Sequence, residues 1–178
     1  MTPDSIIHFW EEAGEKRWFT KDAAFDDMVS TLFSGVLAEA KTGAHDGWAN
    51  TAEGALALVI LLDQFSRNIH RDSRLAFAAD GQALAIAKSA IARGYHTAMP
   101  SQRAMWFVMP FEHAEDLDCQ HQAVTLFTEM GLPEMVHWAE VHRDIIRRYG
   151  RFPHRNRILG RPSTPEELAF LEAGGFAG

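Results

Sequence analysis

The chain has 178 residues, 47% of them hydrophobic, which is enough to bury one substantial core and too few for two comfortable domains. Its formal net charge of −7 argues against general nucleic-acid binding, because neutralising phosphates requires a basic surface. The longest apolar run, residues 55–62, is far shorter than the roughly 20 residues that span a bilayer. The single cysteine, Cys119, excludes an internal disulfide. We therefore expect one soluble, cytoplasmic domain without a membrane segment.

Apolar residues return every three or four positions along most of the chain, which predicts helices and no sheet. A first helix is expected over residues 4–14, with Asp4 as its N-cap, and a second over residues 22–41. A third helix, over residues 51–68, is apolar on every side between 55 and 62, so we expect it at the centre of the fold. The stripe of the second helix that should face the core is Phe25, Met28, Val29, Leu32, Phe33, Val36 and Ala40.

Local signals also divide the second half of the chain into helices. Pro110 cannot continue a helical hydrogen-bond ladder, so it separates a fifth helix from a sixth. Thr164 and Glu167 have the spacing of a capping box, which predicts the start of a last helix. The arginine-rich residues 151–162 are expected to form an ordered loop, because apolar side chains interrupt the charges. The helices predicted here cover residues 73–93, 102–109, 110–130, 133–149 and 164–173, and the helix over 133–149 is bounded by Pro133 in its first turn and by Gly150 after its end.

Three polar motifs follow one another along the chain. Residues 60–68 read ILLDQFSRN, residues 109–117 read MPFEHAEDL, and residues 150–156 read GRFPHRN. Together they resemble the bacterial Domain of Unknown Function 924 family, and matching flanks extend the resemblance over nearly the whole chain. Two positions depart from the family pattern: Ser66 stands where proline is expected, and Ala114 where serine is expected.

The resemblance implies an all-helical fold similar to tetratricopeptide repeats, and it brings no settled activity and no known cofactor. Short connections between successive helices agree with it, since antiparallel helix pairs joined by tight turns form a repeat-like stack. The predicted fold is thus all-α, with antiparallel helix hairpins stacked in one tetratricopeptide-repeat-like domain.

Ionisable residues gather in or beside the three motifs, next to apolar segments. Asp63 and Arg67 have the spacing and order of a helical ion pair, and His142 lies midway along the apolar stripe of its helix. A buried histidine usually has a structural hydrogen bond, but isolated charges beside a core are costly, so we expect these groups to meet around one polar site. The candidate site residues are Asp63, Arg67, Asn68, Glu112, His113, Glu115, Asp116, His142, Arg147, Arg151, His154 and Arg155.

The arginine-rich segment has two interpretations. Arg147, Arg151 and Arg155 could clamp the carboxylates of the helix at 110–130, or the same guanidinium groups with His154 could receive a phosphate or carboxylate ligand. A metal site is not expected, because no diagnostic ligand motif is present.

Two functions remain open from the sequence. The first is a tetratricopeptide-like binding protein for a peptide or protein partner. The second is an enzyme or ligand-binding protein that acts on an anionic small molecule through the polar site. An open groove lined by aromatic side chains would favour a partner. A closed pocket lined by Asp63, His113 and Arg155 would favour a metabolite.

Overall fold

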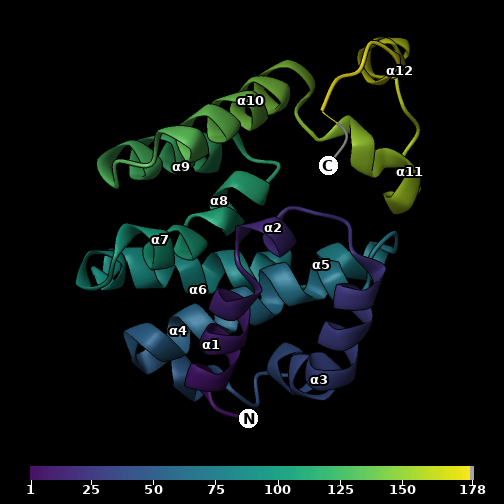
Figure 1. The fold of residues 1–178 in the computed structure, drawn as a ribbon. Coiled ribbons are helices and arrows are strands. Elements are labelled where there is room, and N and C mark those ends of the chain that lie inside the picture. Colours follow the sequence, from purple (N-terminus) through teal and green to yellow (C-terminus); the bar gives the residue numbers. More distant parts are fainter. Residues whose placement is uncertain (177–178) are drawn as a thin grey trace. The chain divides into compact units, whose positions relative to one another are not determined.

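The computed structural model describes residues 1–176, which form helices and turns (Figure 1). No strand occurs among these described residues, which confirms the all-α prediction. Contacts divide the chain into two compact units: unit 1 comprises Met1–Arg71 and Leu75–Pro110, and unit 2 comprises Asp72–Arg74 and Phe111–Gly178. Stacking of hairpins into one tetratricopeptide-like domain stays a prediction.

Unit 1 is built around a long helical segment in which three consecutive elements join without a turn. A π-helical stretch, η2 (Ile60–Phe65), links α4 (Ala52–Val59) to α5 (Ser66–Ile69), and every residue from Gly54 to Ser66 is buried. The prediction of a helix buried on all sides is confirmed. Around it lie α1 (Pro3–Ala13), α2 (Glu15–Trp18), α3 (Ala23–Lys41), η1 (Asp46–Asn50), η3 (Arg74–Phe77), α6 (Asp80–Ala92), η4 (Tyr95–Ala98), α7 (Ser101–Ala104) and η5 (Met105–Phe107).

The close packing of this segment requires glycine at position 54. A Cβ atom at this position would lie 2.1 Å from the carbonyl oxygen of Trp48, in the preceding segment η1. Because that oxygen belongs to the backbone, it cannot move aside as a flexible side chain could. Only glycine lets η1 approach the start of α4 so closely.

Four details of unit 1 differ from the sequence-based predictions. The N-cap of α1 is Thr2, whose hydroxyl accepts from the Ser5 backbone, rather than Asp4. In α3 the side chains of Met28 and Leu32 are 43% and 49% exposed, because the buried face is centred on the opposite edge of the stripe. The helix expected over residues 73–93 is interrupted between η3 and α6. The helix expected over residues 102–109 consists of the short segments α7 and η5.

One stretch of the described chain, Arg74–Ala92, has the length and mean hydropathy, 1.2, of a membrane-spanning helix. Its regular part is only α6, with 13 residues. At about 1.5 Å per residue such a helix is about 20 Å long, short of the roughly 30 Å hydrocarbon core. The geometry therefore does not favour a span, and the cytoplasmic location stays a prediction.

In unit 2, α9 (Leu117–Glu129) and α10 (Pro133–Tyr149) form a helical hairpin, visible side by side in Figure 1. Their turn uses Gly131 in the left-handed conformation, with φ of 69°. The predicted bounds of α10 are confirmed, including Gly150 as its left-handed C-cap. The remaining helical elements are α8 (Met109–His113), which begins in unit 1, and η6 (Pro153–Arg155), α11 (Asn156–Leu159) and α12 (Pro165–Glu172).

Two predictions for unit 2 are wrong in detail. The expected helix over residues 110–130 is broken: α8 ends at His113, and Asp116 caps the start of α9 by accepting from the Cys119 backbone. The i, i+3 and i+7 spacing of His113, Asp116 and Gln120 predicts that they share one face of a continuous helix, but the break divides them between α8, the N-cap of α9 and α9 itself. The segment 151–162 is ordered but contains the helical turns η6 and α11 rather than a simple loop.

The capping box of α12 allows a direct test. The Thr164 hydroxyl accepts from the Glu167 backbone, and the Glu167 carboxylate accepts from the Thr164 backbone. Thr164→Ala should lower the free energy of unfolding, measured in urea, by about 1 kcal/mol, because one helix-end donor loses its acceptor. Thr164→Ser keeps the hydroxyl and serves as the control. An equal loss in both variants would contradict the assignment.

Candidate functional site

The polar residues of the first motif are satisfied within unit 1. Asp63 is fully buried in η2, and its Oδ1 lies 3.0 Å from Nη1 of Arg67, one turn later. The same guanidinium donates two hydrogen bonds of 3.1 Å to the carboxylate of Asp80, at the start of α6. The predicted Asp63–Arg67 ion pair is present, and it ties the central segment to α6.

Asn68 has a comparable structural role. Its side chain donates to Oδ1 of Asp26 at 2.7 Å, and Arg71 donates to both oxygens of the same carboxylate. Burial raises the pKa of Asp26, but the hydrogen bonds from Arg71 and Asn68 outweigh it and hold the pKa below its usual value. These contacts join α3 to α5.

In unit 2 the central feature is a buried carboxylate in contact with a buried histidine. Glu112, in α8, is 2% exposed, and its Oε1 lies 2.6 Å from Nδ1 of His142, in α10. Nδ1 also lies 2.9 Å from the backbone oxygen of Trp138. Both neighbours are acceptors, so Nδ1 carries the proton and the lone pair of a neutral ring is on Nε2.

The end of α8 is held by Gln120, in α9. Its side-chain nitrogen donates to the backbone oxygens of Glu112 at 2.6 Å and of Ala114 at 2.8 Å, so it binds the carbonyl groups that the helix end leaves open. This interaction fixes Glu112 against the α9–α10 hairpin. Ala114, one of the two departures from the family pattern, contributes its backbone oxygen to it.

Two acceptor atoms in this cluster have no hydrogen-bond partner in the described part of the chain. One is Oε2 of Glu112 and the other is Oε1 of Gln120, and both residues are buried. A buried acceptor without a donor typically costs about 1–3 kcal/mol, and a charged one costs more. The cluster therefore has unused capacity to accept hydrogen bonds.

His154, in η6, completes one side of the cluster. Burial and, to a lesser degree, the positive charge of Arg155 together lower the pKa of His154 to about 4, so the ring is neutral at pH 7. Its Nδ1 is buried without a hydrogen-bond partner among the described residues. The rings of His142 and His154 both pack against Phe152, with centroids 5.4 and 5.6 Å away.

Two carboxylate–arginine pairs and one further arginine contact hold the C-terminal part of unit 2 together. Arg161 donates to both oxygens of Glu115 at 2.6 and 2.9 Å. Arg151 donates to both oxygens of Glu167 at 2.6 and 2.9 Å. Arg155 donates to the backbone oxygen of His113 at 3.0 Å and stacks on Phe152.

The carboxylates in these contacts are held in their charged form. Burial raises the pKa of Glu115, but hydrogen bonds from Arg161 and from the Phe152 backbone outweigh it and hold the pKa below its usual value. Hydrogen bonds from Arg151, opposed by burial, lower the pKa of Glu167 to about 2. The arginines thus act mainly as structural partners.

The interpretation of Arg147, Arg151 and Arg155 as a clamp on the carboxylates of residues 110–130 is wrong for Arg147 and for Arg151, which pairs instead with Glu167 in α12. Arg147 is exposed and pairs with Asp144 on its own helix, so it does not reach the carboxylates of the second motif. The side chain that binds Glu115 is Arg161, which sequence reasoning left out of the site. The only sequence feature that pointed to Arg161 was its position at the end of the arginine-rich segment.

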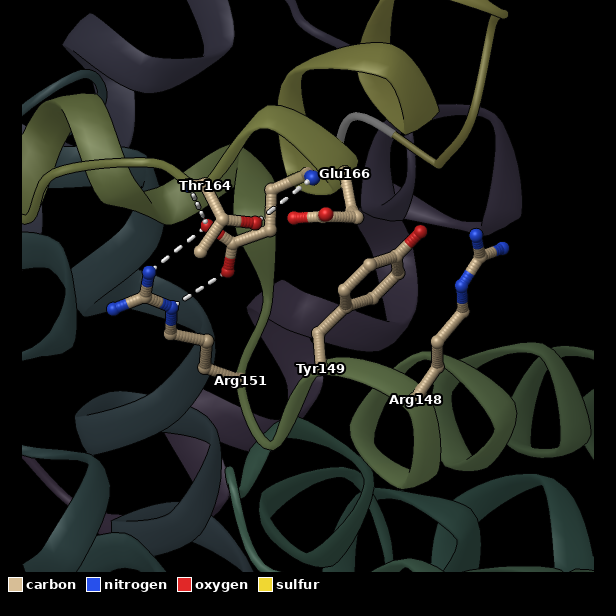
Figure 2. A pocket seen from close by; sticks show the side chains of 6 residues that line it. Arg148, Tyr149, Arg151, Thr164 and Glu166 are labelled. Carbon is tan, nitrogen blue, oxygen red and sulfur yellow. Dashed lines mark hydrogen bonds and ion pairs between the residues drawn. The ribbon is translucent and has the colours of Figure 1, made fainter.

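An open cavity of about 500 Å³ lies on unit 2, between the end of α10 and the start of α12 (Figure 2). Figure 2 shows the Tyr149 ring between Arg151 on one side and Arg148 on the other. Glu167, which accepts hydrogen bonds from Arg151, also lines the cavity. A second cavity of about 520 Å³ lies on unit 1. It is lined by Asp4, Ser5, Ile7, His8, Glu11, Glu53 and Arg103.

The candidate residues thus form two groups, one in each unit. Asp63, Arg67 and Asn68 meet polar partners in unit 1, and the others lie in unit 2. Their predicted union in a single site stays a prediction. Within residues 1–176 no three His, Cys, Asp or Glu side chains are arranged to hold a metal ion.

Comparison with known proteins identifies the family. The model of a family of bacterial proteins of unknown function, DUF924, matches residues 6–175. The chain belongs to the DUF924 family. A solved structure of a protein of unknown function from Agrobacterium tumefaciens is 44% identical over 97% of both chains, with a TM-score of 0.93. No match was found among curated proteins.

Each of the three DUF924 motifs supplies residues to the contacts described above. The first supplies the Asp63–Arg67 pair, the second supplies Glu112 and Glu115, and the third supplies Arg151 and Arg155. The other departure from the family pattern, Ser66, is buried and its hydroxyl donates to the backbone oxygen of Leu75 at 3.3 Å.

The Glu167 contact predicts a dependence of stability on acid. The pKa of Glu167 is about 2 in the folded chain against an ordinary 4.5, so its stabilisation is complete above pH 4.5 and is lost as pH falls towards 2. The difference in urea midpoint between the wild type and Glu167→Gln should therefore shrink over this range. Glu166→Gln, at an exposed neighbouring site, is the control. A difference that stays constant from pH 5 down to about pH 2 would contradict the assignment.

Proposed function

We propose that unit 2 binds a small neutral molecule that donates hydrogen bonds, such as a carboxamide or an alcohol, beside Glu112 and His142. The observation that carries the proposal is Oε2 of Glu112. This atom belongs to a carboxylate that is 2% exposed, and it has no hydrogen-bond partner among the described residues. A ligand that donates to it would remove the cost of leaving a buried charged acceptor without a donor.

The chemistry of the neighbouring groups favours a neutral donor over an anion. Gln120 offers a second buried acceptor without a partner, and one primary amide carries two N–H donors that can bind two acceptors. The arginines that an anion would need are engaged: Arg151 by Glu167 and Arg161 by Glu115.

His142 adds the capacity to move a proton. Glu112 fixes the ring through Nδ1, and this arrangement leaves the Nε2 lone pair as a proton acceptor. Carboxylate, histidine and bound donor then have the roles of orienting group, base and acid. The site is therefore suited to an acid–base step on a bound amide or alcohol.

The other candidate function, binding of a peptide or protein partner, has weaker support. The exposed apolar residues Met28 and Leu32 lie one turn apart on α3, as a partner-binding face would require. However, the two cavities described above, neither of which is lined by Glu112 or His142, have mainly charged and polar linings, which suit small polar ligands better than an apolar helix. We therefore favour the small-molecule function.

Binding can be tested with a matched pair of amides. Acetamide should shift the His142 ring signals in NMR spectra of the full chain, with a dissociation constant on the order of 1 mM, as befits so small a ligand. N,N-dimethylacetamide, which has no N–H group, should not. Glu112→Gln should abolish the acetamide shifts, because the amide replaces an acceptor with a donor, whereas Glu134→Gln, at an exposed site on α10, should preserve them.

Besides a failure of acetamide to bind the wild type, three results would overturn the proposal. One is equal binding of both amides, and another is acetamide binding that survives Glu112→Gln unchanged. The third is a crystal soak in which an ordered water on Oε2 of Glu112 is not displaced by acetamide. That result would give the buried acceptor a purely structural explanation.

The tautomer of His142 gives an independent check of the geometry. In ¹⁵N NMR spectra at neutral pH, the uncharged form should carry its proton on Nδ1, since two acceptors face that atom. His137, which is exposed on the same helix, is the comparison. A neutral His142 protonated on Nε2 would contradict its orientation by Glu112.

A further inference from the structure

The C-terminal segment turns back onto the histidines of unit 2 immediately after α12. Gly174 adopts a left-handed conformation with φ of 79°, and its N–H donates to the backbone oxygen of Leu171 at 3.1 Å. Gly175 donates to the backbone oxygen of Phe170 at 2.9 Å. This pair of bonds is the usual stop of a helix that ends in glycine, and it sets the direction of the residue that follows.

Steric contacts restrict position 175 to glycine, in addition to the hydrogen bond that its N–H donates. A Cβ atom there would lie 2.5 Å from the Phe170 ring and 2.6 Å from the Phe170 backbone oxygen. Only glycine therefore lets the chain pass close to the end of α12. These contacts fix the direction in which the chain leaves α12, and therefore the position of the next residue, Phe176.

Phe176 lies in a cluster of aromatic rings around His142, which we call the aromatic box. The Phe176 ring centroid lies 4.5 Å from that of His142 and 5.3 Å from that of His154, both edge to face. Trp138 lies 6.3 Å away, and the ring also packs against the buried cluster of Ile145, Ile146 and Phe152. The phenyl group thus rests on the same imidazole that Glu112 orients.

We propose that Phe176 occupies the aromatic subsite of the ligand site, and that the natural ligand carries an aromatic ring next to its hydrogen-bond donor. The inference rests on the proposed function above. Phe176 comes from a short segment beyond the last helix, so its ring can leave without unfolding a helix. A ligand ring in its place would keep the contacts with His142 and His154 and bring an attached amide or hydroxyl towards Glu112.

Intramolecular occupation of a subsite weakens every ligand that competes for it. If Phe176 fills the box at least about nine-tenths of the time, its removal should tighten an aromatic ligand about tenfold or more. A ligand without a ring does not need the box. Its affinity should change little.

The experiment compares benzamide with acetamide on the full chain. In Phe176→Ala, benzamide should bind at least about tenfold more tightly than to the wild type, while acetamide binding changes less than about twofold. Ring protons of bound benzamide should show nuclear Overhauser contacts with His142 and His154. Leu168→Ala, which removes an exposed apolar side chain from α12, is the matched control and should leave both affinities unchanged.

A second substitution at the same position keeps the inference falsifiable if Phe176→Ala is unstable. Phe176→Leu retains apolar packing without an aromatic ring, and it should still tighten benzamide relative to the wild type. Adding Glu112→Gln to either variant should abolish the gain, because the donor group of benzamide then lacks its acceptor.

The outcomes separate this inference from the function on which it rests. If acetamide binds as expected but neither Phe176 variant tightens benzamide, the aromatic subsite is refuted and the proposed function stands. A lower melting temperature with unchanged benzamide affinity would show that Phe176 only packs. If acetamide fails to bind the wild type, the proposed function itself is refuted.

Discussion

Carboxylates buried against a helical core need hydrogen-bond donors, and in unit 2 that need organises the C-terminal third of the chain. Glu115 receives two donors from Arg161 and one from the Phe152 backbone. Glu167 receives donors from Arg151, Asn156 and the Thr164 backbone. The Glu115 contacts join the segment before α9 to Phe152 and Arg161, and the Glu167 contacts join α12 to Arg151 and to Asn156 in α11.

Glu112 is the exception to this pattern, and the functional proposal rests on that difference. It is as deeply buried as Glu167, yet one of its oxygens meets His142 and the other meets no donor in the described chain. Sites that bind ligands characteristically retain such polar groups at some cost to stability. The structural carboxylates in the same unit provide the comparison, because both oxygens of each accept hydrogen bonds.

Sequence reasoning succeeded where the signal was local. The bounds of α10 followed from Pro133 and Gly150, and the start of α12 followed from its capping box, because both signals act within one helical turn. It failed at Asp116, where helical spacing suggested a side chain on one face of a longer helix. That side chain instead caps α9, because a short polar side chain can bond the backbone as readily as it can join a helical face.

The sequence by itself determined that the chain is helical, that residues 55–62 are buried, and that His142 faces the interior, since each follows from periodicity and composition over a few turns. Only the tertiary structure decided which partners the charged groups have. Arg161 rather than Arg147 binds Glu115, and Phe176 covers His142, although nothing near either residue in the sequence indicates it. The physical reason is range: caps and stripes depend on neighbours within about four residues, whereas ion-pair and ring contacts depend on how distant segments pack.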